Sequence, residues 1–181
     1  MIQWRSFKEK KIHESGDYAP KHHAVSFQFE HSDPIYASCM WARINLDHDT
    51  FTMTATSDCG DYSYRWQVTE SESFLRLMAR ISGSYLLDAI SSQCVFDFDE
   101  SKQQAVKQAK ICDIDSGIYN QLLDIEPCSE ESFFQIVEGL TKWDFEYIPI
   151  EKRYPAGAVT FCKLFCGYLQ PILRKENDLA S

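Results

Sequence analysis

Residues 50–68 read TFTMTATSDCGDYSYRWQV, and this stretch predicts the centre of the fold. Apolar and polar side chains alternate through residues 51–55 and again through residues 62–68. A period of two is typical of a β-strand that buries one face and exposes the other. Residues 57–60 have turn chemistry, so the two runs are expected to form a hairpin. This hairpin sets three polar pairs opposite one another on one sheet face: Thr56 and Asp61, Thr54 and Ser63, Thr52 and Arg65.

The segments before the hairpin continue this strand pattern. Residues 25–29 alternate in the same way, whereas residues 36–46 are apolar on both faces, as in a central strand. Turn formers separate these runs at residues 31–34 and 47–49. Short connections join antiparallel neighbours, so residues 23–68 predict a four-stranded antiparallel meander.

From residue 69 onward the apolar period becomes helical. Thr69 and Glu72 match a capping box, and Ser129 caps a later helix whose first turn holds two acids. A polar, weakly amphipathic helix is expected to stop at Gly117. Helices are predicted at residues 74–81, 85–90, 99–112, 129–140 and 155–175. Strands followed by four or five helices predict an α+β fold in which the helices cover one face of the sheet.

The last predicted helix, residues 155–175, carries two apolar stripes. A helix that is apolar nearly all round is either the central helix of its domain or half of a dimer contact. We favour the central helix and a monomer, because the meander needs a cover for its inner face.

There is no low-complexity linker or internal repeat, so residues 1–181 are predicted to form a single domain. Residues 1–22 are interpreted as a basic, polar lead-in or an edge strand.

Composition restricts the class of protein. The chain has 181 residues, 44% of them hydrophobic, and a net charge of −9. A chain of this length buries roughly 70% of its unfolded surface, so neither disulfides nor metal is needed for a core. The longest stretch without Lys, Arg, Asp or Glu runs from Leu164 to Leu173, whereas a membrane-spanning helix needs about 20 residues. Seven cysteines at irregular spacings, with no N-terminal secretory signal, predict free thiols in a reducing cytoplasm and no membrane association.

The sequence contains no catalytic signature and no cofactor fingerprint. It lacks a Gly-x-Ser-x-Gly elbow, a Walker or dinucleotide pattern and a His-x-x-x-His pair. Cys128 precedes a helix start, but the glutamates at 130–131 oppose a thiolate there. Residues 47–49, Asp-His-Asp, stand where a hairpin needs turn formers, and His22 and His23 point to opposite faces of a strand. We therefore predict no catalytic residue, no metal site and no cofactor, although an enzyme site assembled from scattered residues would leave no local motif.

Nucleic-acid binding through the sheet is also considered. Aromatic residues on a sheet beside basic ones suit a single-strand binder. Tyr62, Tyr64 and Trp66 alternate as a core face does, with Arg65 on the opposite face, so core packing is favoured. The charge of −9 opposes nonspecific phosphate binding, and direct binding of nucleic acid is not expected. Imitation of DNA phosphates by acidic residues stays an alternative, although these residues are spread over several segments and mixed with 18 bases.

Residues 57–66, SDCGDYSYRW, followed by Phe74-Leu75 and Tyr85-Leu86-Leu87, resemble a pattern found in small phage and prophage proteins of unassigned function. The shared form is Ser-Asp-x-Gly-x-Tyr-x-Tyr-x-Trp, then Phe-Leu, then Tyr-x-Leu, and it covers residues 50–90. The resemblance implies a phage or prophage origin and the cytoplasm of a bacterial host. It also implies the class of acidic phage proteins that inhibit host defence, anti-CRISPR proteins among them. The pattern has no assigned functional residue, so none is transferred.

These observations predict a non-enzymatic interaction protein that binds and inhibits a host protein or ribonucleoprotein complex, such as a CRISPR or other defence effector. The alternative is a nucleic-acid-directed module, either a single-strand binder or an acidic DNA mimic. The predicted binding surface is the polar sheet face that carries Thr52, Thr54 and Ser63 and is centred on Arg65, a residue type enriched at contact sites. A plain solvated face explains the same residues, because threonine is a good exposed strand former.

Overall fold

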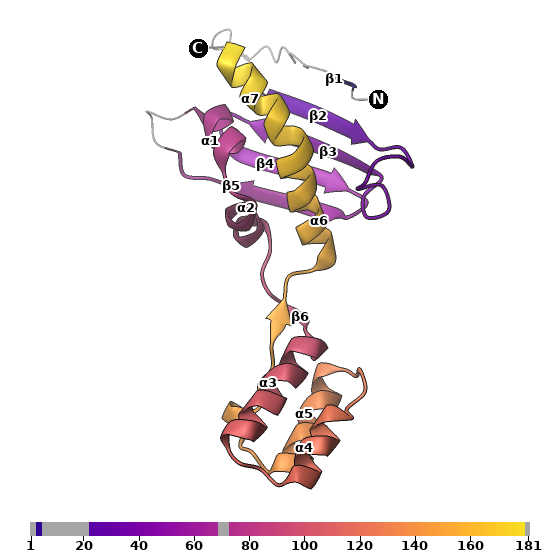
Figure 1. The fold of residues 1–181 in the computed structure, drawn as a ribbon. Coiled ribbons are helices and arrows are strands. Elements are labelled where there is room, and N and C mark those ends of the chain that lie inside the picture. The colour runs from indigo at the N-terminus through magenta and orange to yellow at the C-terminus, as the bar shows by residue number, and fades with distance from the viewer. Residues whose placement is uncertain (1–2, 5–21, 69–72, 180–181) are drawn as a thin grey trace. The chain divides into compact units, whose positions relative to one another are not determined.

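A computed structural model describes residues 3–4, 22–68 and 73–179 (Figure 1). Contacts within the chain divide it into two compact units. Unit 1 comprises Met1–Ser92 and Ala156–Ser181, and unit 2 comprises Gln93–Pro155. Each unit is described separately below, and the expectation of a single domain over residues 1–181 stays a prediction.

Unit 1 is built on an antiparallel sheet with the strand order β1-β2-β3-β4-β5. Its strands are β1 (Gln3–Trp4), β2 (His22–Gln28), β3 (Trp41–Asp47), β4 (Thr52–Ser57) and β5 (Gly60–Arg65). The four strands from β2 to β5 follow one another in sequence and in space, which confirms the predicted meander and the α+β class. The short β1 adds an edge beside β2.

The third strand begins at Trp41 rather than at Tyr36, which corrects the prediction of a strand over residues 36–46. Residues 35–39 instead form turns, in which the N–H groups of Ser38 and Cys39 both donate to the oxygen of Ile35 at 2.9 Å. Ile35 and Cys39 are nevertheless buried in the core of unit 1. The apolar run at residues 36–46 therefore predicted burial correctly at Cys39 but did not predict where the strand begins.

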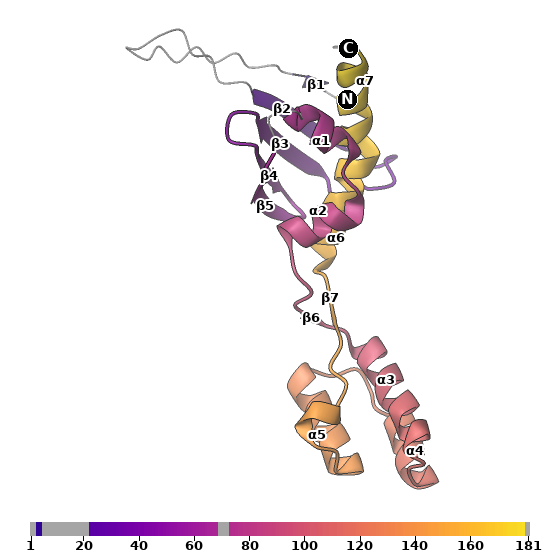
Figure 2. The same cartoon turned by 90° about the vertical axis from the view of Figure 1, so that its left-hand side faces the viewer.

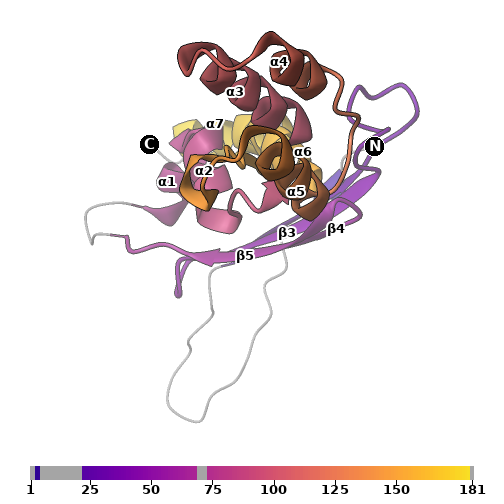
Figure 3. The same cartoon turned by 90° about the horizontal axis from the view of Figure 1, so that it is seen from below.

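Helices cover one face of this sheet. They are α1 (Phe74–Arg80), α2 (Gly83–Ile90), α6 (Ala156–Leu164), the π-helical segment η2 (Phe165–Leu169) and α7 (Gln170–Leu179). Figures 2 and 3 show α1, α2, α6 and α7 on the same side of the sheet. The predicted capping box at Thr69 and Glu72 lies outside the described residues, and α1 follows Ser73.

The segment from α6 through α7 is one continuous helix that supplies most of the cover. Its inward residues are fully buried in one core with the sheet: Phe161, Leu164, Phe165, Leu169 and Leu173. Residues Ala156–Lys175 of this helix have a mean hydropathy of 1.2 and are long and apolar enough to cross a membrane. The uncharged stretch from Leu164 to Leu173 was too short to predict such a helix. Burial of this stripe against the sheet explains the apolar composition. The central-helix interpretation is therefore confirmed, while the monomeric state stays a prediction.

This long helix widens at one place. Over η2 the helix changes to π geometry, and the N–H of Gln170 donates to the oxygen of Phe165, five residues earlier. The next residue, Pro171, has no N–H and its ring would crowd the carbonyl four residues before it. A π turn just ahead of a proline relieves that conflict without breaking the helix.

Unit 2 has a core of its own. Its elements are β6 (Val95–Phe96), α3 (Phe98–Ile111), α4 (Ser116–Leu123), α5 (Glu130–Thr141), the 3₁₀ helix η1 (Phe145–Tyr147) and β7 (Lys152–Arg153). The buried core residues are Ala105, Ala109, Leu122, Ile125, Phe133, Val137 and Ile148. The predicted helices at 99–112 and 129–140 are confirmed, but they pack around this second core instead of extending the core of the sheet.

Two helix starts in unit 2 show how local chemistry acts. The Ser129 hydroxyl accepts from the N–H of Ser132 at 3.2 Å, as predicted for a cap. Gly117 was expected to stop a helix, yet it lies in the first turn of α4. The Asp115 carboxylate accepts from its N–H at 2.8 Å and caps that helix. Gly117, two residues after the capping Asp115, is therefore part of a helix start here.

Candidate functional site

The hairpin of β4 and β5 has the register that the sequence predicts. Thr52 lies opposite Arg65, Thr54 opposite Ser63 and Thr56 opposite Asp61. Met53 and Ala55 between them are buried in the core, so the polar set lies on the other side of the sheet. We call this side the outer sheet face, defined by Trp41, Arg43, Asn45, Thr52, Thr54, Thr56, Asp61, Ser63 and Arg65. Whether Thr52, Thr54, Ser63 and Arg65 bind a partner stays a prediction.

Exposure differs among the predicted residues. Thr54, Ser63 and Arg65 are exposed, whereas Thr52 is half-buried. The Thr52 hydroxyl donates to the oxygen of Thr50 at 3.3 Å and lies 3.0 Å from the Thr50 hydroxyl. Thr52 thus contributes to the β3–β4 turn, and the accessible part of the predicted set is Thr54, Ser63 and Arg65.

The outer sheet face extends onto β3, where sequence reasoning missed two residues. Arg43 lies opposite Thr56, and its guanidinium carbon is 5.9 Å from the centroid of the Trp41 ring. Trp41 is 37% exposed, although tryptophan is usually well buried. Arg and Trp are the residue types that contribute most binding free energy at protein interfaces. The pattern Trp-x-Arg within a strand was the available signal, and the assumption that residues 36–46 are buried on both faces concealed it.

The aromatic residues of β5 and its C-terminal end belong to the inner side of the sheet. The Tyr62 ring packs against Phe161 at a centroid distance of 4.7 Å, and Trp66 is only 3% exposed. Tyr64 is 37% exposed and packs edge-on against Trp66. Core packing is therefore confirmed for Tyr62 and Trp66.

Residues 57–60, which begin the phage-like pattern, build the turn that fixes this end of the hairpin. The Ser57 hydroxyl donates to the oxygen of Gly60 at 2.6 Å, and the Tyr62 hydroxyl donates to the oxygen of Cys59 at 2.8 Å. Gly60 has a φ of 133°, which favours glycine. Burial raises the pKa of Tyr62 to about 12, so its hydroxyl stays protonated and able to donate.

Asp58 of the same turn holds the start of β3. Its carboxylate accepts from the N–H of Met40 at 2.8 Å, from the N–H of Trp41 at 3.3 Å and from the Cys39 thiol at 3.2 Å. Partial burial opposes its ionisation, but these donors prevail and lower the pKa of Asp58. Burial, with Cys59 and Asp58 nearby, raises the pKa of the Cys39 thiol, which stays protonated and donates to Asp58. The phage-like pattern thus positions Trp41 at the edge of the outer sheet face.

Two of the histidines, His23 and His48, form a hydrogen-bonded pair. His23 Nδ1 and His48 Nε2 are 2.6 Å apart, with one nitrogen donating to the other. Burial, followed by the nearby His23, lowers the pKa of His48 to about 4, so the His48 ring is neutral near neutral pH. The Asp47 carboxylate accepts from the N–H groups of Asp49 and Thr50, which confirms the turn. Within the part of the chain that the structure describes, no three His, Cys, Asp or Glu side chains are placed to hold a metal ion.

Comparison with known proteins places the chain in a phage context. A family model described as a phage family matches residues 21–175, which include both cores and the outer sheet face. Neither the curated proteins nor the solved structures gave a match.

Proposed function

The chain belongs to this phage family, and we propose that it is a non-enzymatic interaction protein that binds a host complex through the outer sheet face. The observation that carries the proposal is the composition of that face. The stacked pair of Trp41 and Arg43 on β3 and Arg65 on β5 lie among small hydroxyl side chains. Exposed Trp and Arg side chains among small hydroxyl groups can anchor a macromolecular partner.

The chemistry of the ionisable groups supports binding over catalysis. Asp58 and the Cys39 thiol are occupied in fixing a turn, and His48 is paired with His23. A catalytic acid, base or nucleophile needs a group whose reactive atom is accessible to substrate. The Asp58 carboxylate instead holds the backbone at Met40 and Trp41, where β3 begins.

The partner that we propose is a host defence effector, such as a CRISPR complex, which the protein would inhibit. Support for this step comes from the phage family and from the resemblance of residues 57–66 to small phage proteins. Inhibition by occlusion needs only tight binding to a working surface of the effector. A nucleic-acid-directed role through acidic mimicry is the second candidate, because unit 2 carries thirteen acidic residues against six basic ones.

The test compares charge reversals on and off the proposed face. The tagged full chain is expressed in a bacterial host with an active CRISPR system, copurified proteins are quantified, and phage plaquing reports interference. Arg65→Glu should lower capture of the effector at least about tenfold while changing stability by about 0.5 kcal/mol or less. Arg76→Glu, an exposed position on α1, is the matched control and should leave capture unchanged.

The outcomes separate the candidates. Equal capture by wild type and by a folded Arg65→Glu protein would remove the outer sheet face as the site. Capture that persists in Arg65→Glu but is lost when acidic residues of unit 2 are reversed would favour mimicry. Capture with no effect on phage plaquing would contradict inhibition but not binding.

A further inference from the structure

A groove on unit 2 combines an apolar floor with an acidic rim. It has a volume of about 670 Å³ and lies between the first turn of α5 and the chain segment that runs from η1 into β7. The residues that line it are Glu130, Glu131, Phe134, Glu146, Ile148, Ile150 and Lys152. All of them belong to unit 2, so the groove is complete within that unit.

The floor of the groove follows from the chain geometry of residues 146–152. Ile148, Ile150 and Lys152 belong to the segment that runs from η1 into β7, and all three line the groove. Phe134 projects from α5 one turn after Glu130, so it meets this row from the other wall. Ile148 is 6% exposed and belongs to the core, whereas Phe134 and Ile150 are half-buried and offer apolar surface.

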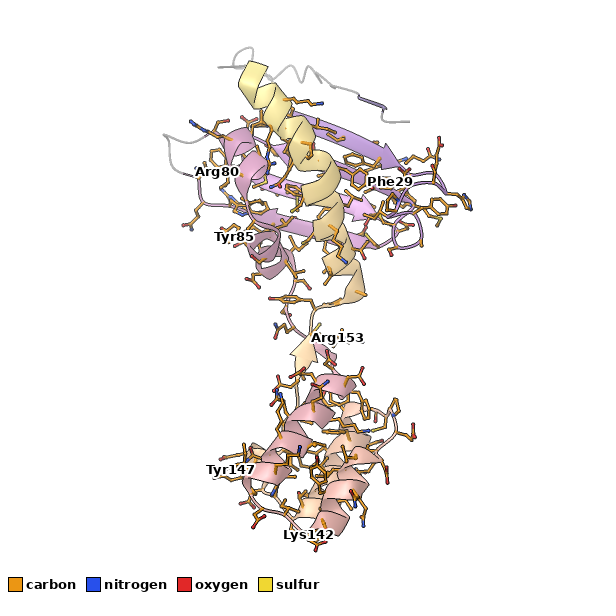
Figure 4. All side chains as sticks on the ribbon, viewed as in Figure 1. Phe29, Arg80, Tyr85, Lys142, Tyr147 and Arg153 are labelled. Atoms are coloured by element: carbon orange, nitrogen blue, oxygen red, sulfur yellow. The ribbon has the colours of Figure 1, made fainter. Side chains whose placement is uncertain are left out.

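The walls of the groove are fixed by hydrogen bonds. The N–H of Glu151 donates to the Ser101 hydroxyl of α3 at 2.8 Å, and the N–H of Asp97 donates to the oxygen of Glu151 at 2.9 Å. β7, on which Arg153 is labelled in Figure 4, pairs with β6. The first turn of α5 is held by its Ser129 cap. A preorganised groove loses little conformational entropy when it is filled.

The rim is negatively charged. Lys152 Nζ is 3.2 Å from Glu130 Oε1, so the one cation of the groove is already paired. Glu131 and Glu146 are exposed, and among the side chains that the structure describes neither has an ion-pair partner. Of the net charge of −9, unit 2 contributes most, with thirteen acidic residues against six basic ones. The field over the groove therefore attracts cationic groups.

We propose that this groove binds an extended segment of a partner protein in which Lys or Arg residues stand next to Leu, Ile or Val. The apolar side chains of the segment fill the floor against Phe134 and Ile150. Its cationic groups pair with Glu131 and Glu146. The groove is separate from the outer sheet face, so this inference holds or fails independently of the proposed function. It also differs from imitation of DNA, which would use charge alone.

The test uses the full ¹⁵N-labelled chain and three synthetic hexapeptide amides as probes. Lys-Leu-Lys-Leu-Lys-Leu carries both properties, Lys-Ser-Lys-Ser-Lys-Ser keeps only the charge, and Glu-Leu-Glu-Leu-Glu-Leu keeps only the apolar residues. The first peptide should shift the amide signals of residues 130–134 and 146–152. It should bind at least about tenfold more tightly than either of the others.

Variants locate the binding on the protein. The double variant Glu131→Lys and Glu146→Lys should bind the Lys-Leu peptide with an affinity at least about tenfold lower than that of the wild type. Glu138→Lys, an exposed position on the same helix but outside the groove, is the control and should change affinity by less than about threefold. Arg65→Glu should leave peptide binding unchanged, which separates this test from that of the proposed function.

Three results would overturn the inference. One is equal binding of the Lys-Ser and Lys-Leu peptides, since the apolar floor would then contribute nothing. Another is a set of shifted signals that excludes residues 130–134 and 146–152. The third is undiminished affinity in a double variant whose remaining spectrum matches that of the wild type.

Discussion

The side-chain amide of Gln170 donates a hydrogen bond to the main-chain oxygen of Ile81, 2.7 Å away and 89 residues earlier in the chain. The same amide lies 3.2 Å from the oxygen of Met78, and Arg174 Nε donates to the oxygen of Ala79 at 2.9 Å. The last carbonyls of a helix have no partner within the helix. The start of α7 therefore caps the end of α1, and Gln170 is buried at 3% exposure to do so.

Gln170→Leu should lower the free energy of unfolding by about 1–3 kcal/mol, because it leaves buried carbonyls without a donor at nearly constant volume. Urea denaturation followed by circular dichroism measures the change. Lys163→Gln on the exposed side of α6 is the control and should stay within about 0.5 kcal/mol of wild type. An equally small effect of Gln170→Leu would mean that solvent replaces the lost donor.

Gly157→Ala should destabilise unit 1 by about 1–3 kcal/mol, the usual cost of overpacking. A Cβ atom at Gly157 would overlap the main-chain oxygen of Cys59, to which Tyr62 also donates. Gly167 in η2 has open space at the same position, so Gly167→Ala should stabilise by about 0.5–1 kcal/mol. Thermal unfolding of the two variants compares these opposite signs directly, and similar melting temperatures would contradict the packing argument.

Acid should destabilise the protein between about pH 6.5 and pH 4 through His48. The pKa of His48 is about 4 in the folded chain because of burial, against an ordinary value of 6.5. The unfolded chain therefore binds more protons in this interval, and the free energy of unfolding falls as the pH is lowered. His48→Asn, which retains a turn-forming residue, should make the free energy of unfolding, measured by urea denaturation, depend less on pH in this interval. Its ionisable neighbours His22, His23, Asp47 and Asp49 stay in place, so an unchanged slope in the variant would assign the dependence to them.

Replacing Gln93–Pro155 by a short Gly/Ser linker should leave unit 1 folded. The chain leaves unit 1 after α2 and re-enters it at α6, and these two helices pack against each other. The ¹H–¹⁵N spectrum of the shortened chain should overlay that of unit 1 in the full protein. Loss of dispersed signals would instead support the single-domain prediction, in which both units unfold together.

Local patterns predicted local structure well. Alternation at residues 51–55 and 62–68 gave the hairpin and its register, because a slip of one residue would turn Met53 to solvent. Ser129 predicted the start of α5 correctly, because a helix cap depends only on hydrogen bonds between residues a few positions apart. The shared face of the polar row on β4 and β5 was predicted correctly, whereas Trp41 and Arg43 were assigned to a strand buried on both faces. That this face binds a partner stays a prediction.

The division into two units and the groove of unit 2 could not be predicted from these local patterns. Nothing in the composition near Ser92 or Ala156 marks the place where the chain leaves unit 1 and returns, since both places are short and ordinary in residue content. The groove of unit 2 depends on Glu131 and Glu146, which come together only when α5 packs beside residues 146–152. Short-range sequence patterns cannot show that Glu131 and Glu146 line the same groove.

The insertion of unit 2 between α2 and α6 sets the order in which the protein can mature on a ribosome. The sheet, α1 and α2 are translated first, yet the long helix from α6 to α7, which belongs to the same core, is translated only after the whole of unit 2. During that interval part of the apolar face of the nascent sheet lacks its later cover, and chaperones and aggregation compete for it. Unit 2 is a continuous stretch, so its own folding need not wait for any later residue. Translation speed across residues 93–155 therefore sets how long the first-made half stays vulnerable, and slow codons there should lower soluble yield without altering the final protein.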